Sequence, residues 1–181
     1  MRKFLKTENL ANLKVMITAA VFAAISIVCG KFLAFPIGET MRFSLENLPI
    51  ILSGALYGPA VAAITGLVAD LVGCILRGYA INPIITAASV FIGFAAGAVF
   101  SIMKSSSIHI KLALAVIICH LIGSVIIKTV GLSVMLSYPF LPTLIGRIIN
   151  YIIVAAAEFI LLEAVFRNKS FLKTMGSKDE L

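Results

Sequence analysis

Charged residues are scarce in this chain. Of its 181 residues only 13% are Asp, Glu, Lys or Arg, and 61% are hydrophobic. A soluble domain usually has about a quarter charged residues, so we do not expect a water-soluble monomer. A transmembrane helix needs roughly 20 apolar residues to cross about 30 Å of hydrocarbon. The apolar residues are therefore enough for five or six spans, and too few residues remain for a soluble domain.

Cysteine is also rare, and several catalytic motifs are missing. Cys29, Cys74 and Cys119 lie singly within apolar runs, which argues against a disulfide framework and against a zinc site. Without a G-x-x-x-x-G-K-[ST] loop, the chain itself is not expected to bind ATP. Because H-E-x-x-H, G-x-S-x-G and paired loop acids are also lacking, we expect no enzyme, no cofactor and no metal site.

Six apolar runs are separated by charged segments or by segments rich in proline and glycine. They lie near residues 15–30, 45–57, 59–76, 83–103, 112–136 and 144–166. They predict an all-α integral membrane protein with six transmembrane helices, forming a single membrane domain over residues 1–181. The second run is doubtful because about 13 residues at about 1.5 Å each reach only about 20 Å. A re-entrant segment is the alternative there.

The basic residues favour six spans over five. With six spans, both chain ends and the 104–111 loop share one side, which then holds ten of the fifteen Lys and Arg residues. With five spans, the two basic ends would face opposite sides. Because Lys and Arg concentrate on the cytoplasmic side, we expect both termini in the cytoplasm. The net charge of +7 then reflects membrane orientation, and nucleic-acid binding is not expected.

Polar residues recur at helical spacing in three of the runs. Residues three or four apart share a helix face, and an ionisable group inside a membrane is a functional candidate by default. The three stripes are Gly66, Asp70, Gly73 and Arg77; His120, Ser124 and Lys128; and Arg147, Asn150, Val154 and Glu158. We interpret the three stripes as the lining of a common interior.

Four cations fall in the outer half of the six-span arrangement. Lys128 lies 17 residues, or about 25 Å of helix, beyond Lys111. Arg42, Arg77 and Arg147 lie near the outer ends of their segments. Cations gathered in a low-dielectric cavity attract a small anion that carries carboxylates or phosphates. The neutral groups that we expect to orient this anion are Tyr79, Asn82, His120 and Asn150.

Each of these residues also has a simpler explanation. Any single cation can snorkel to the outer interface. Asp70 and Glu158 lie deeper, where pairing with an arginine or capping of the backbone accounts for them. His120 is more often an interhelical hydrogen-bonding residue than a ligand contact. The convergence of four cations is what favours a binding site.

Small residues repeat along the first run. Ala19, Ala20, Ala23 and Ala24 form two small-xxx-small pairs on neighbouring helix faces. Such pairs permit the close approach of another helix in a membrane. We therefore predict a partner-docking surface on this helix.

Several short motifs carry a resemblance to a known family. Residues 42–49 read RFSLENLP and residues 53–59 read SGALYGP, followed by Gly66, Asp70 and Gly73. Together with DLVGC at 70–74 and GYAINP at 78–83, they make the sequence resemble the S components of energy-coupling-factor (ECF) vitamin transporters, most of all the folate-specific one. The resemblance extends over nearly the whole chain.

This resemblance implies a subunit in a prokaryotic plasma membrane that captures a vitamin at the outer face. It would dock on an ECF module, composed of one transmembrane coupling subunit and two ATPases that bind the ATP. In that family the alanine-rich first helix contacts the coupling subunit. The matching residues are Ala19, Ala20, Ala23 and Ala24, and their pattern leaves open which alanine face docks.

Folate fits the expected cavity. Its glutamate tail carries two carboxylates for Arg42, Arg77, Lys128 or Arg147, and its pterin could stack on Tyr79 and hydrogen-bond to Asn150. An S component for another vitamin or precursor is the alternative, with cationic thiamine disfavoured. A more distant alternative is a membrane enzyme that uses Asp70 and His120 on lipid-linked substrates, and another is a structural subunit without a ligand.

Overall fold

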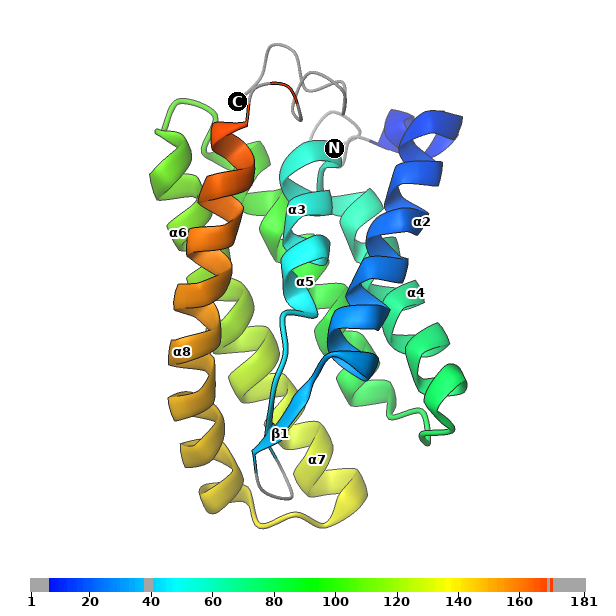
Figure 1. The fold of residues 1–181 in the computed structure, drawn as a ribbon, viewed down its shortest axis with the longest axis vertical. Coiled ribbons are helices and arrows are strands. Elements are labelled where there is room, and N and C mark those ends of the chain that lie inside the picture. Colours follow the sequence, from blue (N-terminus) through cyan, green and yellow to red (C-terminus); the bar gives the residue numbers. More distant parts are fainter. Residues whose placement is uncertain (1–6, 38–40, 169, 171–181) are drawn as a thin grey trace.

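Helices make up almost all of the chain that the computed structural model describes, which is residues 7–37, 41–168 and 170 (Figure 1). The elements are η1 (Thr7–Ala11), α2 (Leu13–Ile27), η2 (Val28–Phe32), β1 (Phe35–Ile37), β2 (Met41–Phe43), α3 (Asn47–Tyr57), α4 (Pro59–Arg77), α5 (Pro83–Ile102), α6 (Ile108–Ile118), η3 (Cys119–Ile127), α7 (Lys128–Leu136) and α8 (Phe140–Arg167).

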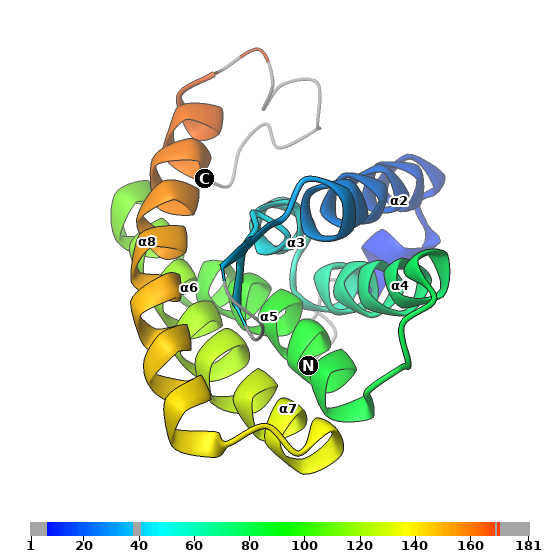
Figure 2. The ribbon, with the colours of Figure 1, turned by 60° about the horizontal axis from the view of Figure 1, so that its bottom comes forward.

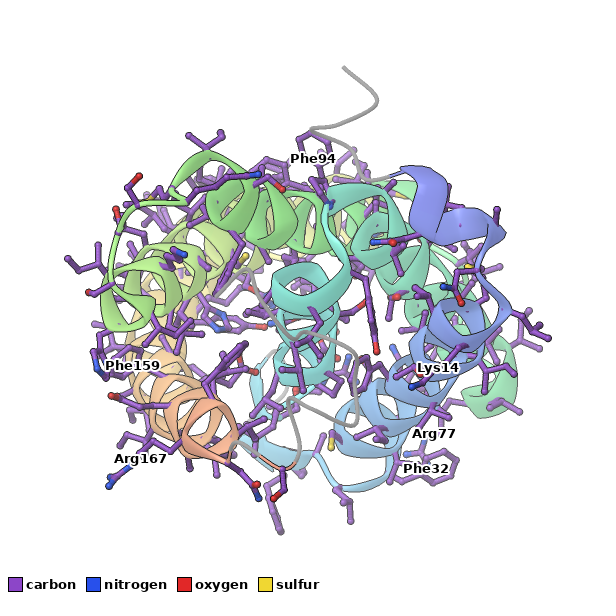
Figure 3. All side chains as sticks on the ribbon, turned by 90° about the horizontal axis from the view of Figure 1, so that it is seen from above. Lys14, Phe32, Arg77, Phe94, Phe159 and Arg167 are labelled. Carbon is purple, nitrogen blue, oxygen red and sulfur yellow. The ribbon has the colours of Figure 1, made fainter. Side chains whose placement is uncertain are left out.

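Five helices are long and apolar enough to cross a membrane. Two of them are composite: α2 continues into the π-helical turn η2, and α6, the π-helix η3 and α7 follow one another without a break. The other three are α4, α5 and α8. Large aliphatic and aromatic side chains such as Ile17 and Phe94 are exposed on these helices, and Figure 3 shows Phe94 on the outside of the bundle. An apolar exterior of this kind suits a hydrocarbon environment.

The second apolar run differs from the other five. Its helix α3 has only 11 residues, or about 16 Å of helix, which is too short to cross a bilayer alone. The chain reaches α3 through an antiparallel hairpin in which Phe35 faces Phe43 and Pro36 faces Arg42. Figure 1 shows this hairpin toward the lower end of the bundle and α3 in its upper part. Extended chain thus covers the depth that α3 does not reach.

The described chain begins and ends at the same end of the bundle. In Figure 1, the first turns of α2 and the last turns of α8 both lie at the top. The six crossings predicted from the sequence would place the two ends in this way. The side of the membrane on which this end lies remains a prediction from the distribution of Lys and Arg.

Local signals in the sequence set the helix boundaries. The side chain of Asn12 accepts hydrogen bonds from the backbone N–H groups of Lys14 and Val15, and so caps α2. Proline begins both α4 and α5, at the one helical position where its missing N–H costs little. Between α3 and α4, Gly58 adopts a φ of 90°, which a residue with a side chain rarely does.

Glycines allow α3, α4 and α5 to approach one another closely. A Cβ atom on Gly54 of α3 would lie 2.7 Å from the backbone nitrogen of Gly97 on α5. Gly66 of α4 and Gly93 of α5 likewise face the backbone of the opposite helix. These glycines therefore serve packing within the bundle, as small residues commonly do between membrane helices.

Candidate functional site

A cavity of about 690 Å³ lies at the hairpin end of the bundle. Its walls come from η2, the hairpin, the end of α4, the segment 78–82, the start of α5, α7 and α8. Figure 2 brings this end forward and shows the hairpin running between α8 and α2. The volume is within the usual range for pockets that enclose a small organic molecule. The charged and aromatic residues of the lining are Lys31, Arg42, Glu46, Asp70, Tyr79, Lys128, Tyr138, Arg147 and Tyr151.

Positive charge is in excess in this cavity. Four cationic side chains (Lys31, Arg42, Lys128 and Arg147) face two carboxylates (Glu46 and Asp70), which leaves two net positive charges. Low-dielectric walls strengthen the potential that such an excess creates. The cavity is therefore suited to a ligand with two negative charges.

Glu46 links two of the cations. Nζ of Lys128 donates a hydrogen bond to Oε1 of Glu46 at 2.6 Å, and Nη2 of Arg42 lies 3.8 Å from Oε2. The carboxylate raises the pKa of the Arg42 guanidinium, so Arg42 stays cationic. Lys128 is buried, and a buried ammonium needs such a partner because its desolvation is costly.

Arg147 is held by α6–η3–α7 and by its own helix. Its Nε and Nη2 donate to the carbonyl oxygen of Ser124 at 3.0 and 2.7 Å, and its guanidinium lies 5.2 Å from the ring centroid of Tyr151. These contacts fix the planar group at the cavity wall. Arginine has five N–H donors, so donors remain for a ligand.

The two predicted asparagines line the cavity but already have structural roles. Asn82 caps α5 through its Oδ1, and its Nδ2 donates to the carbonyl oxygen of Gly131 at 2.8 Å. Asn150 donates to the carbonyl oxygen of Arg42 at 3.2 Å, which ties the hairpin to α8. Both amides thus position neighbouring segments of the lining.

Aromatic rings provide flat apolar surface beside these charges. Tyr79 is 48% exposed, and Nζ of Lys31 lies 5.9 Å from the centroid of its ring. Tyr138 and Tyr151 contribute further lining on the α7 and α8 side. Flat heteroaromatic ligands are commonly held by stacking on rings of this kind.

Two predicted site residues, Arg77 and His120, do not line this cavity. Arg77 is exposed at the end of α4, with its guanidinium 5.4 Å from the ring centroid of Phe32 and 5.9 Å from that of Tyr79. Arg77 and Phe32 both lie at the periphery in Figure 3. His120 points into the core, where its Nε2 lies 2.8 Å from Oε2 of Glu158. The simpler explanations, snorkelling for Arg77 and interhelical hydrogen bonding for His120, describe these positions.

Lys31 and Glu46 are charged lining residues that the sequence reasoning missed. Lys31 follows the first apolar run directly, a position that predicts the start of an outer loop. Glu46 pairs with a lysine 82 positions away, a contact that periodicity within one helix does not indicate. Its spacing of four residues from Arg42, within the motif at 42–49, was the available signal.

Asp70 has a structural partner at the cavity wall. It accepts a hydrogen bond from Oγ1 of Thr86 at 2.7 Å, which connects α4 with α5. Among the described residues, no group of three or more His, Cys, Asp or Glu side chains is arranged to hold a metal ion.

The four alanines of α2 divide into two faces. Ala19 and Ala23 are 5% and 3% exposed and pack into the core. Ala20 and Ala24 are exposed, in a surface that also includes Ile17. Only the Ala20–Ala24 pair is therefore accessible to another protein.

Comparisons with known proteins agree with this architecture. The sequence profile described as "ECF transporter, substrate-specific component" matches residues 14–166. The crystal structure of FolT bound with folic acid superposes with a TM-score of 0.68 at 24% identity, covering 84% of this chain and 95% of that one. The S-component for biotin from an ECF-type ABC transporter gives 0.65 at 19% identity, covering 88% and 94%. These two likenesses establish the fold. No curated protein sequence matches significantly.

Proposed function

We propose that folate is the ligand of this chain, which belongs to the family of substrate-specific components of ECF transporters. Members of this family are substrate-binding subunits of transporters. The chain is therefore a multi-pass membrane protein that binds a substrate, and it is not an enzyme. We infer the identity of the substrate from the cavity.

The excess of two positive charges in the cavity is the observation that carries the proposal. The glutamate tail of folate has two carboxylates, which would neutralise this excess at Arg42, Lys128 and Arg147. Tyr79 supplies a ring on which a pterin can stack. The similarity to FolT, whose structure contains folic acid, supports the same ligand.

Another vitamin is the alternative, and biotin is the specific candidate because an S-component for biotin has the same fold. Biotin carries one carboxylate, so it would leave one of the two excess charges unpaired. An unpaired charge in a desolvated site is costly. The charge balance therefore favours folate over biotin.

We further propose that the chain captures its ligand from the outer face of a prokaryotic plasma membrane. In this arrangement the chain crosses the membrane six times, with both termini in the cytoplasm, and the cavity opens at the opposite end. The Ala20–Ala24 surface of α2 docks on the coupling subunit of an ECF module, and the two ATPases of that module bind the ATP. Small residues on this surface favour close helix contact in a bilayer.

Equilibrium binding tests the ligand. The purified chain in detergent is titrated with folate, with biotin and with a pterin that lacks the glutamate tail. We expect folate to bind most tightly, the truncated pterin to lose roughly 10-fold or more because the charged hydrogen bonds are absent, and biotin not to compete. Tighter binding of biotin than of folate would overturn the proposed ligand.

A further inference from the structure

The cavity contains a carboxylate of its own at the position where a ligand carboxylate would bind. Glu46 accepts the 2.6 Å hydrogen bond from Lys128, and the two side chains are only 14% and 7% exposed. Two carboxylates on one buried ammonium repel each other strongly in a low dielectric. A ligand anion therefore interacts fully with Lys128 only when Glu46 moves away.

Lys31 offers Glu46 a second cation. Both side chains line the same small space, and opposite charges attract each other strongly where water is largely excluded. Lys31 is 9% exposed, and its nearest polar contact is Sγ of Cys74 at 4.0 Å. Within the described chain Lys31 forms no ion pair. The Asp70 carboxylate lines the same space but accepts a hydrogen bond from Thr86, so the charge of Lys31 is available to a displaced carboxylate.

The space between Lys31 and Glu46 is polar and of suitable size. It has a volume of about 10 Å³, enough for a single water or one carboxylate oxygen. Ser26, Asn47, Asp70 and Ser89 contribute polar lining. Oδ1 of Asn47, a residue that lines this space, is buried without a hydrogen-bond partner, and a water or a ligand group can satisfy such an oxygen.

The backbone of Glu46 is held in place, so only its side chain can move between Lys128 and Lys31. Oγ of Ser26 donates to the Glu46 carbonyl oxygen at 2.6 Å. Gly30 packs so closely on Glu46 that an added Cβ would lie 2.7 Å from the Cβ of Glu46. Any movement of the carboxylate between Lys128 and Lys31 must therefore come from side-chain rotation.

We propose that Glu46 is a resident counter-ion that a ligand carboxylate displaces from Lys128, and that Glu46 then pairs with Lys31. The chemistry of the ligand rests on the proposed function. The exchange makes Glu46 a specificity-determining residue. A ligand without a carboxylate leaves the Glu46–Lys128 pair in place and gains nothing from Lys128.

A double-mutant cycle between Glu46 and Lys31 tests the exchange. Folate affinity is measured for the wild type, Glu46→Gln, Lys31→Gln and the double variant. We expect Glu46→Gln to tighten folate binding about tenfold, the lower end of what a hydrogen bond to a charged group contributes. Lys31→Gln should weaken folate about tenfold in the wild-type background and at most about twofold in the Glu46→Gln background. The truncated pterin should bind Glu46→Gln as it binds the wild type, and any effect of Lys31→Gln on it through the Tyr79 ring should be the same in both backgrounds.

Matched substitutions at the opposite end of the bundle serve as controls. Glu163 pairs with His109, and Lys104 is exposed, so Glu163→Gln and Lys104→Gln make the same chemical changes outside the cavity. Glu46→Asp keeps the charge but shortens its reach, and should tighten folate to a smaller extent. It provides a second variant if Glu46→Gln fails to fold. Weaker folate binding by both Glu46 variants, or an effect of Lys31→Gln that is equally large in the Glu46→Gln background, would overturn the exchange.

Glutarate tests the displacement of Glu46 independently of whether folate is the ligand. As a bare dicarboxylate it tests only whether an anion competes with Glu46. We expect millimolar glutarate to raise the thermal stability of Glu46→Gln more than that of the wild type. If the wild type binds no folate, the proposed ligand is wrong, and the glutarate result alone decides the counter-ion proposal. Equal stabilisation of both proteins would refute it.

Discussion

Arg42 and Arg77 provide a matched test of the cationic cavity. The sequence places both in one cluster, but only Arg42 lines the cavity, whereas Arg77 lies beside Phe32 at the periphery (Figure 3). Removing Arg42 leaves no buried charge without a partner, because Glu46 keeps its 2.6 Å hydrogen bond to Lys128. Any change in affinity for Arg42→Ala thus reports on the ligand more than on folding.

The expected changes in folate affinity for the two variants differ by more than the error of a binding assay. A hydrogen bond to a charged group contributes about 1.5 to 3 kcal/mol, so Arg42→Ala should weaken folate roughly 10- to 150-fold. Arg77→Ala should change it less than about twofold, because Arg77 does not line the cavity and contacts it only through the Tyr79 ring, so no charged contact to the glutamate tail is lost. Isothermal titration in detergent measures both, with the truncated pterin as the comparison ligand. That pterin should bind both variants as it binds the wild type.

Two results would refute this reasoning. If both variants bind folate normally, the cations do not contact the ligand. If Arg77→Ala weakens folate as much as Arg42→Ala, the cavity extends to the end of α4 in the bound state. A parallel loss of the truncated pterin would instead indicate altered folding, which thermal unfolding of each variant checks.

Three further predictions follow from the described contacts. Ala20→Trp should prevent association with the coupling subunit, measured by copurification, and should leave folate binding unchanged. Ala23→Trp, inside the core, should lower the free energy of unfolding by about 1 to 3 kcal/mol, measured by an unfolding experiment. Asn82→Ala should cost about 0.5 to 2 kcal/mol of stability, read from thermal unfolding, because α5 loses its cap. In cells, an impermeant thiol reagent should label Ser137→Cys from outside but not Ser107→Cys, and the reverse pattern would invert the proposed topology.

The helices were predictable because each long helix coincides with an apolar run. The run near 59–76 corresponds to α4 at Pro59–Arg77, and the run near 83–103 to α5 at Pro83–Ile102. Proline, charge and glycine interrupt the runs where the helices end, so composition alone locates these boundaries. The hairpin was not predictable, because strands of three residues are too short for a pattern of alternation to emerge.

The contacts of the cations with other parts of the chain could not be predicted from the sequence. A cation near the end of a span can snorkel or turn inward, and only the neighbouring helices decide which occurs. The guanidinium of Arg77 lies near the rings of Phe32 and Tyr79, whereas that of Arg147 donates to the carbonyl oxygen of Ser124. These partners come from other parts of the chain, so helical spacing could not distinguish the two arginines.

The position of His120 outside the cavity has its cause in depth along the helix. His120 and Lys128 are eight residues apart, which is about two turns of α-helix, or roughly 12 Å along the axis. The segment between them, η3, is π-helical over Cys119–Ile127, and its wider turn still keeps positions i, i+4 and i+8 on a similar face. Lys128 therefore lines the cavity, whereas His120 lies deeper, beside the Tyr151 ring and next to Glu158 in the core. The shared face can be read from the sequence, but the depth to which the cavity extends depends on how the helices pack, so this stripe was the least predictable part of the site.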